Sequence, residues 1–150
     1  MAITGAAIIT GLLFAFSNFV MRALADLPND KGMFAMQRVN ERILNPVFLI
    51  LFLGTPTLCA LIAFKSAQQL DSSGSLLLFI GALAYFIGPF GITVLFNVPL
   101  NNKLAEAEQS VADDVWPVYQ KKWLYWNHFR TCIGVVSIVL LAAGLGTGEG

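Results

Sequence analysis

The sequence predicts an all-α protein whose four transmembrane helices form a bundle, with a short interfacial helix between the first and the second. Hydrophobic residues make up 57% of the 150 residues and charged residues only 12%, which leaves too little polar surface to cover a soluble globule. Four apolar runs each approach the roughly 20 residues that a helix needs to cross the bilayer core. Polar residues gather between these runs. We therefore expect one integral-membrane domain over residues 1–150.

The four helices are expected at about residues 2–25, 46–64, 76–98 and 123–145. The first run lacks the charged start and the clear cleavage site of a signal peptide, so we expect it to be retained as a helix. Asn45 and Pro46 are typical of a cap and a first-turn residue at the start of the second helix. Pro56 and Pro89 predict kinks inside the second and third helices.

The polar connection at residues 26–41 is predicted to hold the interfacial helix. After a turn signal, apolar residues such as Met33 and Leu44 share one helical face. The pattern permits two orientations. Either the polar residues face solvent on a surface helix, or Gln37 and Asn40 turn inward toward a site.

The densest polar chemistry lies in WLYWNHFRT, residues 123–131, where the fourth apolar run begins. On a helix, one stripe holds Trp123, Trp126, Asn127 and Arg130. The only histidine, His128, lies on the neighbouring stripe. Because an unpaired charge in hydrocarbon is costly, we expect this cluster to find partners on other helices or to stay near the water boundary.

The basic residues predict the orientation in the membrane. The segments after the first and third helices contain Arg22, Lys31, Arg38, Arg42, Lys103, Lys121 and Lys122. The segment after the second helix contains only Lys65. The positive-inside rule then places the more basic segments in the cytoplasm of a cell with a plasma or inner membrane, and both termini outside. The polar residues that gather at this cytoplasmic end include Asn18, Gln37, Asn40, Asn97, Asn101, Asn127, His128 and Arg130.

Several classes of function find no support in the sequence. The formal net charge of zero argues against nucleic acid as a partner. Cys59 and Cys132 lie in apolar runs, where cysteine usually behaves as a small hydrophobe, and they offer no disulfide framework. The acidic residues from Glu106 to Asp114 lack the convergent spacing of a metal-binding loop, so we expect no metal site.

The chain resembles the anthrone oxygenase-like family of small membrane proteins, much of which is known only as a domain of unknown function. The resemblance rests on FSNFVMRAL, MQRVNERILNP, NVPLNNKL and WPVYQKKWLYWNHFRT, at residues 16–24, 36–46, 97–104 and 116–131. The last segment is the most specific. The resemblance implies a four-helix membrane fold and, for some members, the oxidation of an anthrone to an anthraquinone without a metal or flavin cofactor.

The residues themselves permit a cofactor-free oxygenase. A base removes an acidic C–H proton next to aromatic carbonyl groups, and the electron-rich carbanion reacts with dioxygen. His128 is the candidate base, since imidazole titrates closest to neutral pH. Asn127, Asn97 or Arg130 would stabilise the developing enolate, and Trp123 and Trp126 would stack on a flat, hydrophobic aromatic ligand. The predicted substrate-binding set also includes Asn101, Asn18, Gln37 and Asn40.

Two other interpretations remain open at this point. The same polar residues can form a hydrogen-bond network that only holds the helix ends together. Alternatively, the protein is an accessory subunit of a larger membrane complex that binds lipid, quinone or pigment. A single histidine cannot supply both axial ligands of a two-histidine haem within one chain. Small residues on the first and third helices make self-association plausible.

Overall fold

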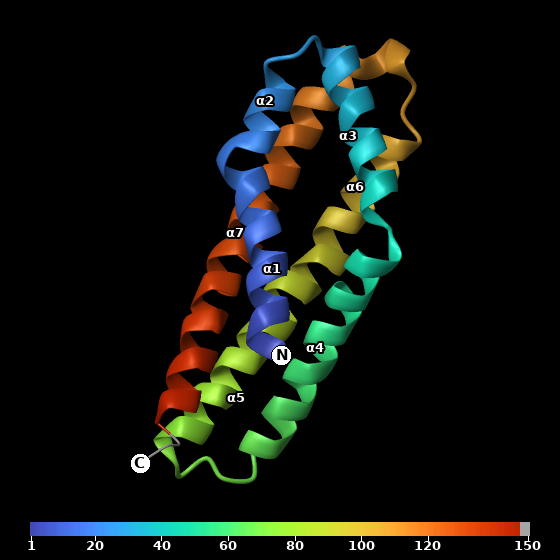
Figure 1. Ribbon diagram of the computed structural model, residues 1–150. Coiled ribbons are helices and arrows are strands. Elements are labelled where there is room, and N and C mark those ends of the chain that lie inside the picture. The colour runs from blue at the N-terminus through green and yellow to red at the C-terminus, as the bar shows by residue number, and fades with distance from the viewer. Residues whose placement is uncertain (148–150) are drawn as a thin grey trace.

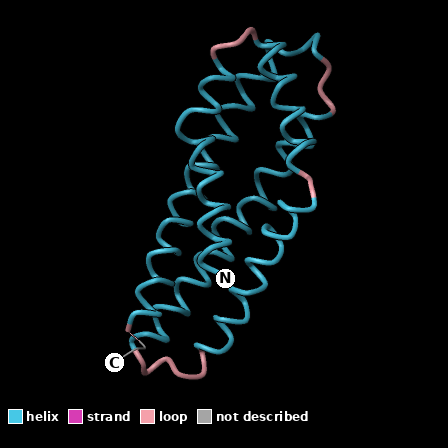
Figure 2. Tube along the Cα trace, in the orientation of Figure 1, coloured by secondary structure: helices cyan, strands magenta, loops and turns pink. Residues whose placement is uncertain are grey.

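The computed structural model describes residues 1–147 of the chain, and this range contains helices and no strand (Figure 1). Figure 2 shows that only short loops join the helices. Four of the helical stretches in this range are long and apolar enough to cross a membrane, namely Ala2–Ala25, Pro46–Ser66, Ser73–Ala105 and Gln109–Gly146. The predicted all-α, four-helix membrane fold is confirmed, and the protein is an integral membrane protein.

The first membrane-crossing stretch consists of three elements in line. α1 (Ala2–Ala15) continues into η1 (Phe16–Val20), a π-helical segment, and then into α2 (Met21–Ala25). After a short turn, α3 (Asn29–Ile43) forms the additional short helix that the sequence predicts between the first two spans. Asp30 in its first turn and Arg42 in its last turn complement the helix dipole.

The second crossing helix, α4 (Pro46–Ser66), begins as the sequence predicts. The side chain of Asn45 accepts a hydrogen bond from the backbone nitrogen of Phe48 at 3.1 Å, and Pro46 occupies the first turn. Pro56 lies inside α4, and the helix continues through it to Ser66. This start fixes where α4 leaves α3, directly beside the cavity described below.

The third and fourth crossing stretches extend beyond the predicted bounds. The third comprises α5 (Ser73–Tyr85), the π-helical η2 (Phe86–Asn97) and α6 (Val98–Ala105), whereas residue 98 was the predicted end. After the short η3 (Gln109–Val111), α7 (Ala112–Gly146) begins eleven residues before the predicted residue 123. Two acidic residues, Asp113 and Asp114, favour this earlier start because they interact with the positive end of the helix dipole.

These two long stretches are longer than the hydrocarbon core of a bilayer is thick. The 33 residues of Ser73–Ala105 span about 50 Å at the usual rise of 1.5 Å per residue, against a hydrocarbon core of about 30 Å. Figure 1 shows that α3 and α6 lie together at the end of the bundle opposite the α4–α5 connection. We call this end the α3 end. The charged residues of α3 indicate that α3 lies outside the hydrocarbon core.

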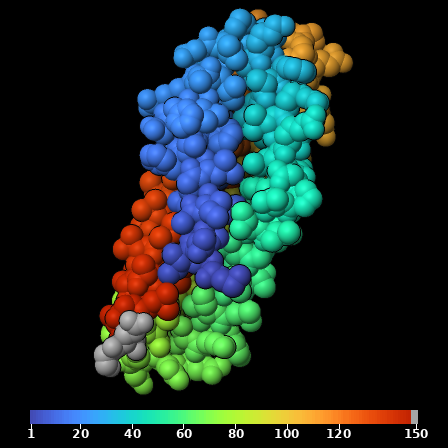
Figure 3. Space-filling view, viewed as in Figure 1, coloured from blue at the N-terminus to red at the C-terminus, as the bar shows by residue number. Residues whose placement is uncertain are grey.

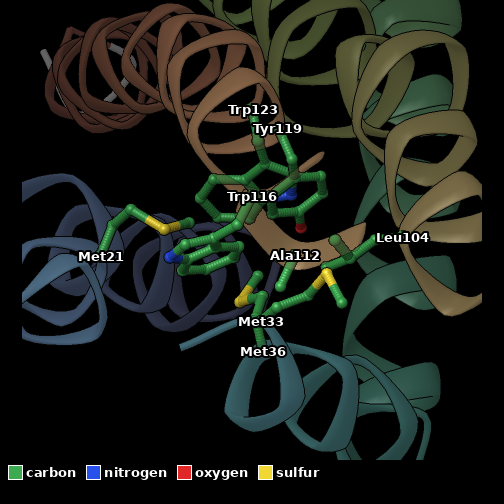
Figure 4. Close-up of a cluster of buried hydrophobic side chains, with 8 residues drawn as sticks. All are labelled: Met21, Met33, Met36, Leu104, Ala112, Trp116, Tyr119 and Trp123. Atoms are coloured by element: carbon green, nitrogen blue, oxygen red, sulfur yellow. The ribbon is translucent and has the colours of Figure 1, made fainter. Parts of the chain in front are cut away.

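Two separate cores lie at different levels of the bundle. The methionine-aromatic core, near the α3 end, consists of Met21, Met33, Met36, Leu104, Ala112, Trp116, Tyr119 and Trp123 (Figure 4). The small-residue core, between α1, α4, α5 and α7, consists of Ala2, Ala6, Cys59, Ala63, Ala82, Tyr85 and Leu141. Along α7, the polar residues Asn127, Arg130 and Thr131 lie between the residues of these two cores.

Candidate functional site

Asn127 is the centre of the polar residues on α7, and its side chain is completely buried. Its amide nitrogen donates to the backbone oxygen of Leu13 and to the hydroxyl oxygen of Ser17, both at 2.8 Å. Its amide oxygen accepts two hydrogen bonds from Arg130, from Nε at 3.0 Å and from Nη2 at 2.7 Å. Asn127 therefore ties η1 to α7 and at the same time fixes the orientation of the guanidinium.

Arg130 is 5% exposed, and the hydrogen-bond partners of its guanidinium are neutral side chains. Its Nη1 donates to the hydroxyl oxygen of Thr93 in η2 at 2.6 Å, and its Cζ lies 5.1 Å from the centroid of the Trp123 ring. Within residues 1–147, α3 contains both ion pairs, Lys31 with Asp30 and Arg38 with Glu41. Neither pair includes Arg130. No carboxylate in this range therefore neutralises the buried cation.

Two asparagines from the third crossing stretch contact the aromatic residues of α7. The amide oxygen of Asn101 accepts from the hydroxyl of Tyr119 at 2.9 Å and from Nε1 of Trp123 at 2.8 Å. This double contact fixes which side of the amide is oxygen, and so directs the nitrogen away from these two donors. Asn97 is 1% exposed and donates to the backbone oxygen of Trp123 at 3.2 Å.

A mostly apolar cavity of about 220 Å³ lies beside these residues. In Figure 3 the surface is indented along the seam between the blue segments of α1 and the cyan segments of α3 and α4. Four polar residues line the cavity, namely Asn40, Thr93, Asn101 and Arg130. The indole of Trp123 lines it as well, and the remaining lining is aliphatic or aromatic, from α1, η1, α3, α4 and α6. The volume lies below the range of about 300 to 1,000 Å³ typical of drug-sized ligands, which indicates a small ligand.

Both π-helical segments lie at the level of this cavity. Ser17 in η1 accepts from Asn127, and Thr93 in η2 accepts from Arg130, so each wide turn supplies a partner to the polar residues of α7. π-Helical turns are rare and are found frequently at functional sites. Their position here favours a site over a purely apolar packing interface.

The structure separates the predicted site residues into two groups. Asn40, Asn101, Trp123 and Arg130 line the cavity, and Asn127 and Asn97 lie behind it. His128, Trp126, Asn18 and Gln37 do not line it. Roles in catalysis or binding stay predictions for both groups.

The residues of the second group have other surroundings. His128 is exposed, and its Nδ1 lies 3.0 Å from the Ser17 hydroxyl oxygen. Trp126 stacks on Phe96 with ring centroids 3.8 Å apart, and Asn18 is exposed. The amide nitrogen of Gln37 donates to the backbone oxygens of Leu104 in α6 and of Ala107 just after it, which anchors α3 to the end of the third crossing stretch.

Sequence reasoning missed two contributors, Ser17 and Thr93. Each appeared as an ordinary hydroxyl inside an apolar helix, where such a group usually bonds to its own backbone. Thr93 does bond to the backbone oxygen of Pro89, yet it also accepts from Arg130. The sequence did contain a signal for both residues. A buried arginine needs several hydrogen-bond acceptors, and Ser17 and Thr93 lie at the same depth in their helices as Arg130 does in its own.

The lining of the cavity also limits which groups it can hold. It contains no imidazole, thiol or carboxylate from the described residues. Nowhere in residues 1–147 do three or more His, Cys, Asp or Glu side chains come together as ligands for a metal ion. What the cavity offers is a fixed cation, amide groups and aromatic surface.

The fold and the site define a small four-helix membrane protein with an apolar cavity beside a buried cation. The chain belongs to the anthrone oxygenase family, whose model matches residues 48–140. The match confirms the family resemblance seen in the sequence, and it covers Thr93, Asn97, Asn101 and the polar residues of α7. It does not include α1 or α3. Neither the curated proteins nor the solved structures contain a match to this chain.

Proposed function

We propose that this protein is a membrane-embedded oxygenase that binds a flat aromatic substrate, such as an anthrone, in the cavity beside Arg130 and promotes its oxidation by dioxygen. The observation that carries the proposal is the buried cation without a carboxylate partner at the wall of an apolar cavity, in a chain of the anthrone oxygenase family. A site of this kind favours a substrate with a large apolar body and one oxygen that gains negative charge.

The proposed reaction needs only dioxygen as a second reactant. An anthrone loses a proton from its methylene carbon, and the negative charge moves to the ketone oxygen. Two electrons of the enolate then form a carbon–oxygen bond with dioxygen, and the resulting peroxide takes up a proton. Loss of water from this hydroperoxide gives the second ketone, so one anthrone and one dioxygen become one anthraquinone and one water.

Arg130 has the central role in this proposal. Its guanidinium lies in a largely water-free environment, where a charge interaction is stronger than in water, and its orientation is set before the substrate arrives. The amide nitrogen of Asn101 is a second donor on the same wall. Trp123 offers a flat surface for the aromatic rings.

His128 receives a different role from the one that the sequence first suggested. Its imidazole lies outside the cavity and reaches the site only through the hydroxyl of Ser17, which Asn127 also contacts. We propose that His128 is a positioning residue that helps to hold Ser17 and Asn127, and through them Arg130. Removal of the substrate proton then falls to water.

The proposal also includes the placement in the membrane. The basic residues favour a plasma or inner membrane with the α3 end in the cytoplasm and both termini outside. Leu44 and Leu53, which line the cavity, are 64% and 54% exposed on the outer surface of the bundle. An apolar substrate dissolved in the bilayer therefore meets the cavity directly from the side, between α1 and α4.

Oxygen uptake by the purified protein tests the proposal. An anthrone is added to the protein in an uncharged detergent, and oxygen consumption and anthraquinone absorbance are followed together. Because anthrones oxidise slowly by themselves, the reference is the Arg130→Gln variant at equal concentration. The proposal expects one dioxygen consumed per anthraquinone, at a rate well above this reference. Equal rates for both proteins and for buffer alone would leave the polar residues with a bracing role.

A further inference from the structure

We propose that the cavity takes its ligand as an organic anion, so that an ionised aromatic compound binds and its neutral counterpart is rejected. The ring system assumed for the ligand rests on the proposed function. The charge of the ligand is inferred separately, from the contacts around Arg130, and defines the substrate class as aromatic compounds with an ionised phenol, enol or carboxylic acid.

The polar wall of the cavity, formed by Asn40, Thr93, Asn101, Trp123 and Arg130, carries a positive charge. An arginine side chain stays protonated in proteins. Arg130 is buried next to hydrocarbon, and within residues 1–147 its partners are all neutral. A cation in this environment has lost most of its hydration, and neutral hydrogen-bond acceptors replace that loss only in part. An anion in the cavity restores the missing counter-charge.

The hydrogen-bonding groups around Arg130 are unequally occupied. Asn101 Oδ1 on the wall and Asn127 Oδ1 behind it each accept two hydrogen bonds, and the Thr93 hydroxyl oxygen accepts from Arg130 while it donates to Pro89. Two amide nitrogens of the wall remain as donors. Asn101 presents its nitrogen, and the buried amide nitrogen of Asn40 has no hydrogen-bond partner within the described residues.

This imbalance discriminates between two forms of the same ligand. A neutral phenol or acid must donate its own hydrogen, and at this wall the oxygens of Asn101 and Thr93, which line the cavity beside Arg130, already hold hydrogen bonds. The ionised form carries only acceptors, which match the guanidinium and the two amide nitrogens. A buried polar group left without a partner lowers binding affinity. The anion is therefore preferred for two reasons: the neutral form binds more weakly, and the charged form binds more tightly.

The apolar part of the lining selects the body of the ligand. Phe16, Phe48 and Phe52 line the cavity together with aliphatic residues of α1 and α4. A hydrated inorganic ion gains nothing from this surface, whereas a fused aromatic ring system buries its faces there. The polar and apolar parts of the lining together fit an amphiphilic aromatic anion.

Two ligand pairs test the inference on the unmodified protein, without oxygen or turnover. Anthraquinone carboxylate is compared with its methyl ester, and hydroxyanthraquinone with its methyl ether, by quenching of tryptophan fluorescence in an uncharged detergent. We expect each anion to bind at least about tenfold more tightly than its neutral partner, since a paired buried charge exceeds a neutral contact by more than about 1.4 kcal/mol. Equal affinities would overturn the inference.

The colour of hydroxyanthraquinone gives a second, independent measurement, because its phenolate absorbs at longer wavelength than the phenol. We expect the pH at which half of the ligand is ionised to fall by about one unit or more when the protein is present. Arg130→Gln should abolish this fall, whereas Arg22→Gln, which removes an exposed arginine near the same end of the bundle, should retain it. A fall of the same size in both variants, or no fall with the unmodified protein, contradicts the inference.

The outcome separates the inference from the proposed function. If the anions bind selectively and anthrone oxidation is no faster than in the reference, the oxygenase proposal fails and the anion site stands. If anthrone is oxidised and the neutral ligands bind as well as the anions, the oxygenase proposal stands and the anion inference fails.

Discussion

The two halves of α7 face very different surroundings, although both belong to one continuous helix. From Gly134 to Gly144 the helix packs against α5 through small residues. An added Cβ at Gly144 would lie 2.9 Å from the backbone oxygen of Gly74, and Ser137 donates to the backbone oxygen of Gly81 at 2.7 Å. From Trp123 to Arg130 the same helix is held away from α4 by a cavity, and side chains make its contacts.

The difference separates a closely packed part of the bundle from the part where we propose that the reaction takes place. Close helix contacts in the small-residue core gain dispersion energy and leave no space for a ligand. Near the α3 end, two π-helical segments and a buried cation lie around the cavity, and such features are more typical of functional sites than of packed cores. Substitutions in the two halves should therefore change different properties.

The largest expected effect is on turnover in the Arg130→Gln variant. Glutamine keeps a hydrogen-bonding side chain but removes the positive charge, so anthrone oxidation should fall by about a hundred- to a thousandfold, as for the loss of a donor to a developing oxyanion. Oxygen uptake measures the change, and Arg22→Gln is the control for overall charge. Unchanged turnover in Arg130→Gln would mean that the cavity beside Arg130 is not the reaction site.

The second effect concerns stability in the packed half. In Gly144→Ala the new Cβ approaches the Gly74 backbone oxygen and the Leu78 backbone nitrogen at 2.9 and 3.0 Å, so α5 and α7 must separate. Overpacking of this kind costs about 1 to 3 kcal/mol. The control is Gly146→Ala on the same helix, where a Cβ meets nothing within 4 Å. Thermal unfolding in detergent should show a lower midpoint for Gly144→Ala only, and equal midpoints would contradict the packing contrast.

A third, smaller effect should follow from Thr93→Val, which has nearly the same shape but lacks the acceptor for Arg130 Nη1. We expect turnover to fall about tenfold, because one hydrogen bond to a charged group contributes about 1.5 to 3 kcal/mol and part of this holds the guanidinium in place. Thr57→Val is the matched control, since Thr57 also bonds to a carbonyl of its own helix and lies outside the cavity. Equal losses in both variants would indicate a general effect on the helices.

Much of this arrangement could be predicted from the sequence, and the rest depends on rotation and packing. Four apolar runs predict the spans, and Asn45 and Pro46 predict the start of α4, because both features are local. The stripe of Asn127 and Arg130 was also visible. The π-helical form of η1 and η2 was not. Pro89 in η2 predicted a kink without indicating its form, and the sequence of η1 contains nothing that distinguishes it from α-helix. Their form depends on contacts with α7 that only the folded chain supplies.

His128 gives the smallest expected effect and the sharpest test of that limit. Successive residues on a helix are rotated by about 100°, so when Asn127 faces the interior His128 faces the periphery. The exposed imidazole of His128 agrees with this geometry, because it contacts the Ser17 hydroxyl from the outer surface of the bundle. We therefore expect His128→Ala to lower turnover only a few-fold, about 1 kcal/mol or less for one exposed hydrogen bond. Ser17→Ala should have a comparable or larger effect, since it removes the hydroxyl that contacts both His128 and Asn127. Complete loss of oxygen uptake in His128→Ala, with ligand binding intact, would instead assign the imidazole the role of base and require the substrate to reach the outer face of α7.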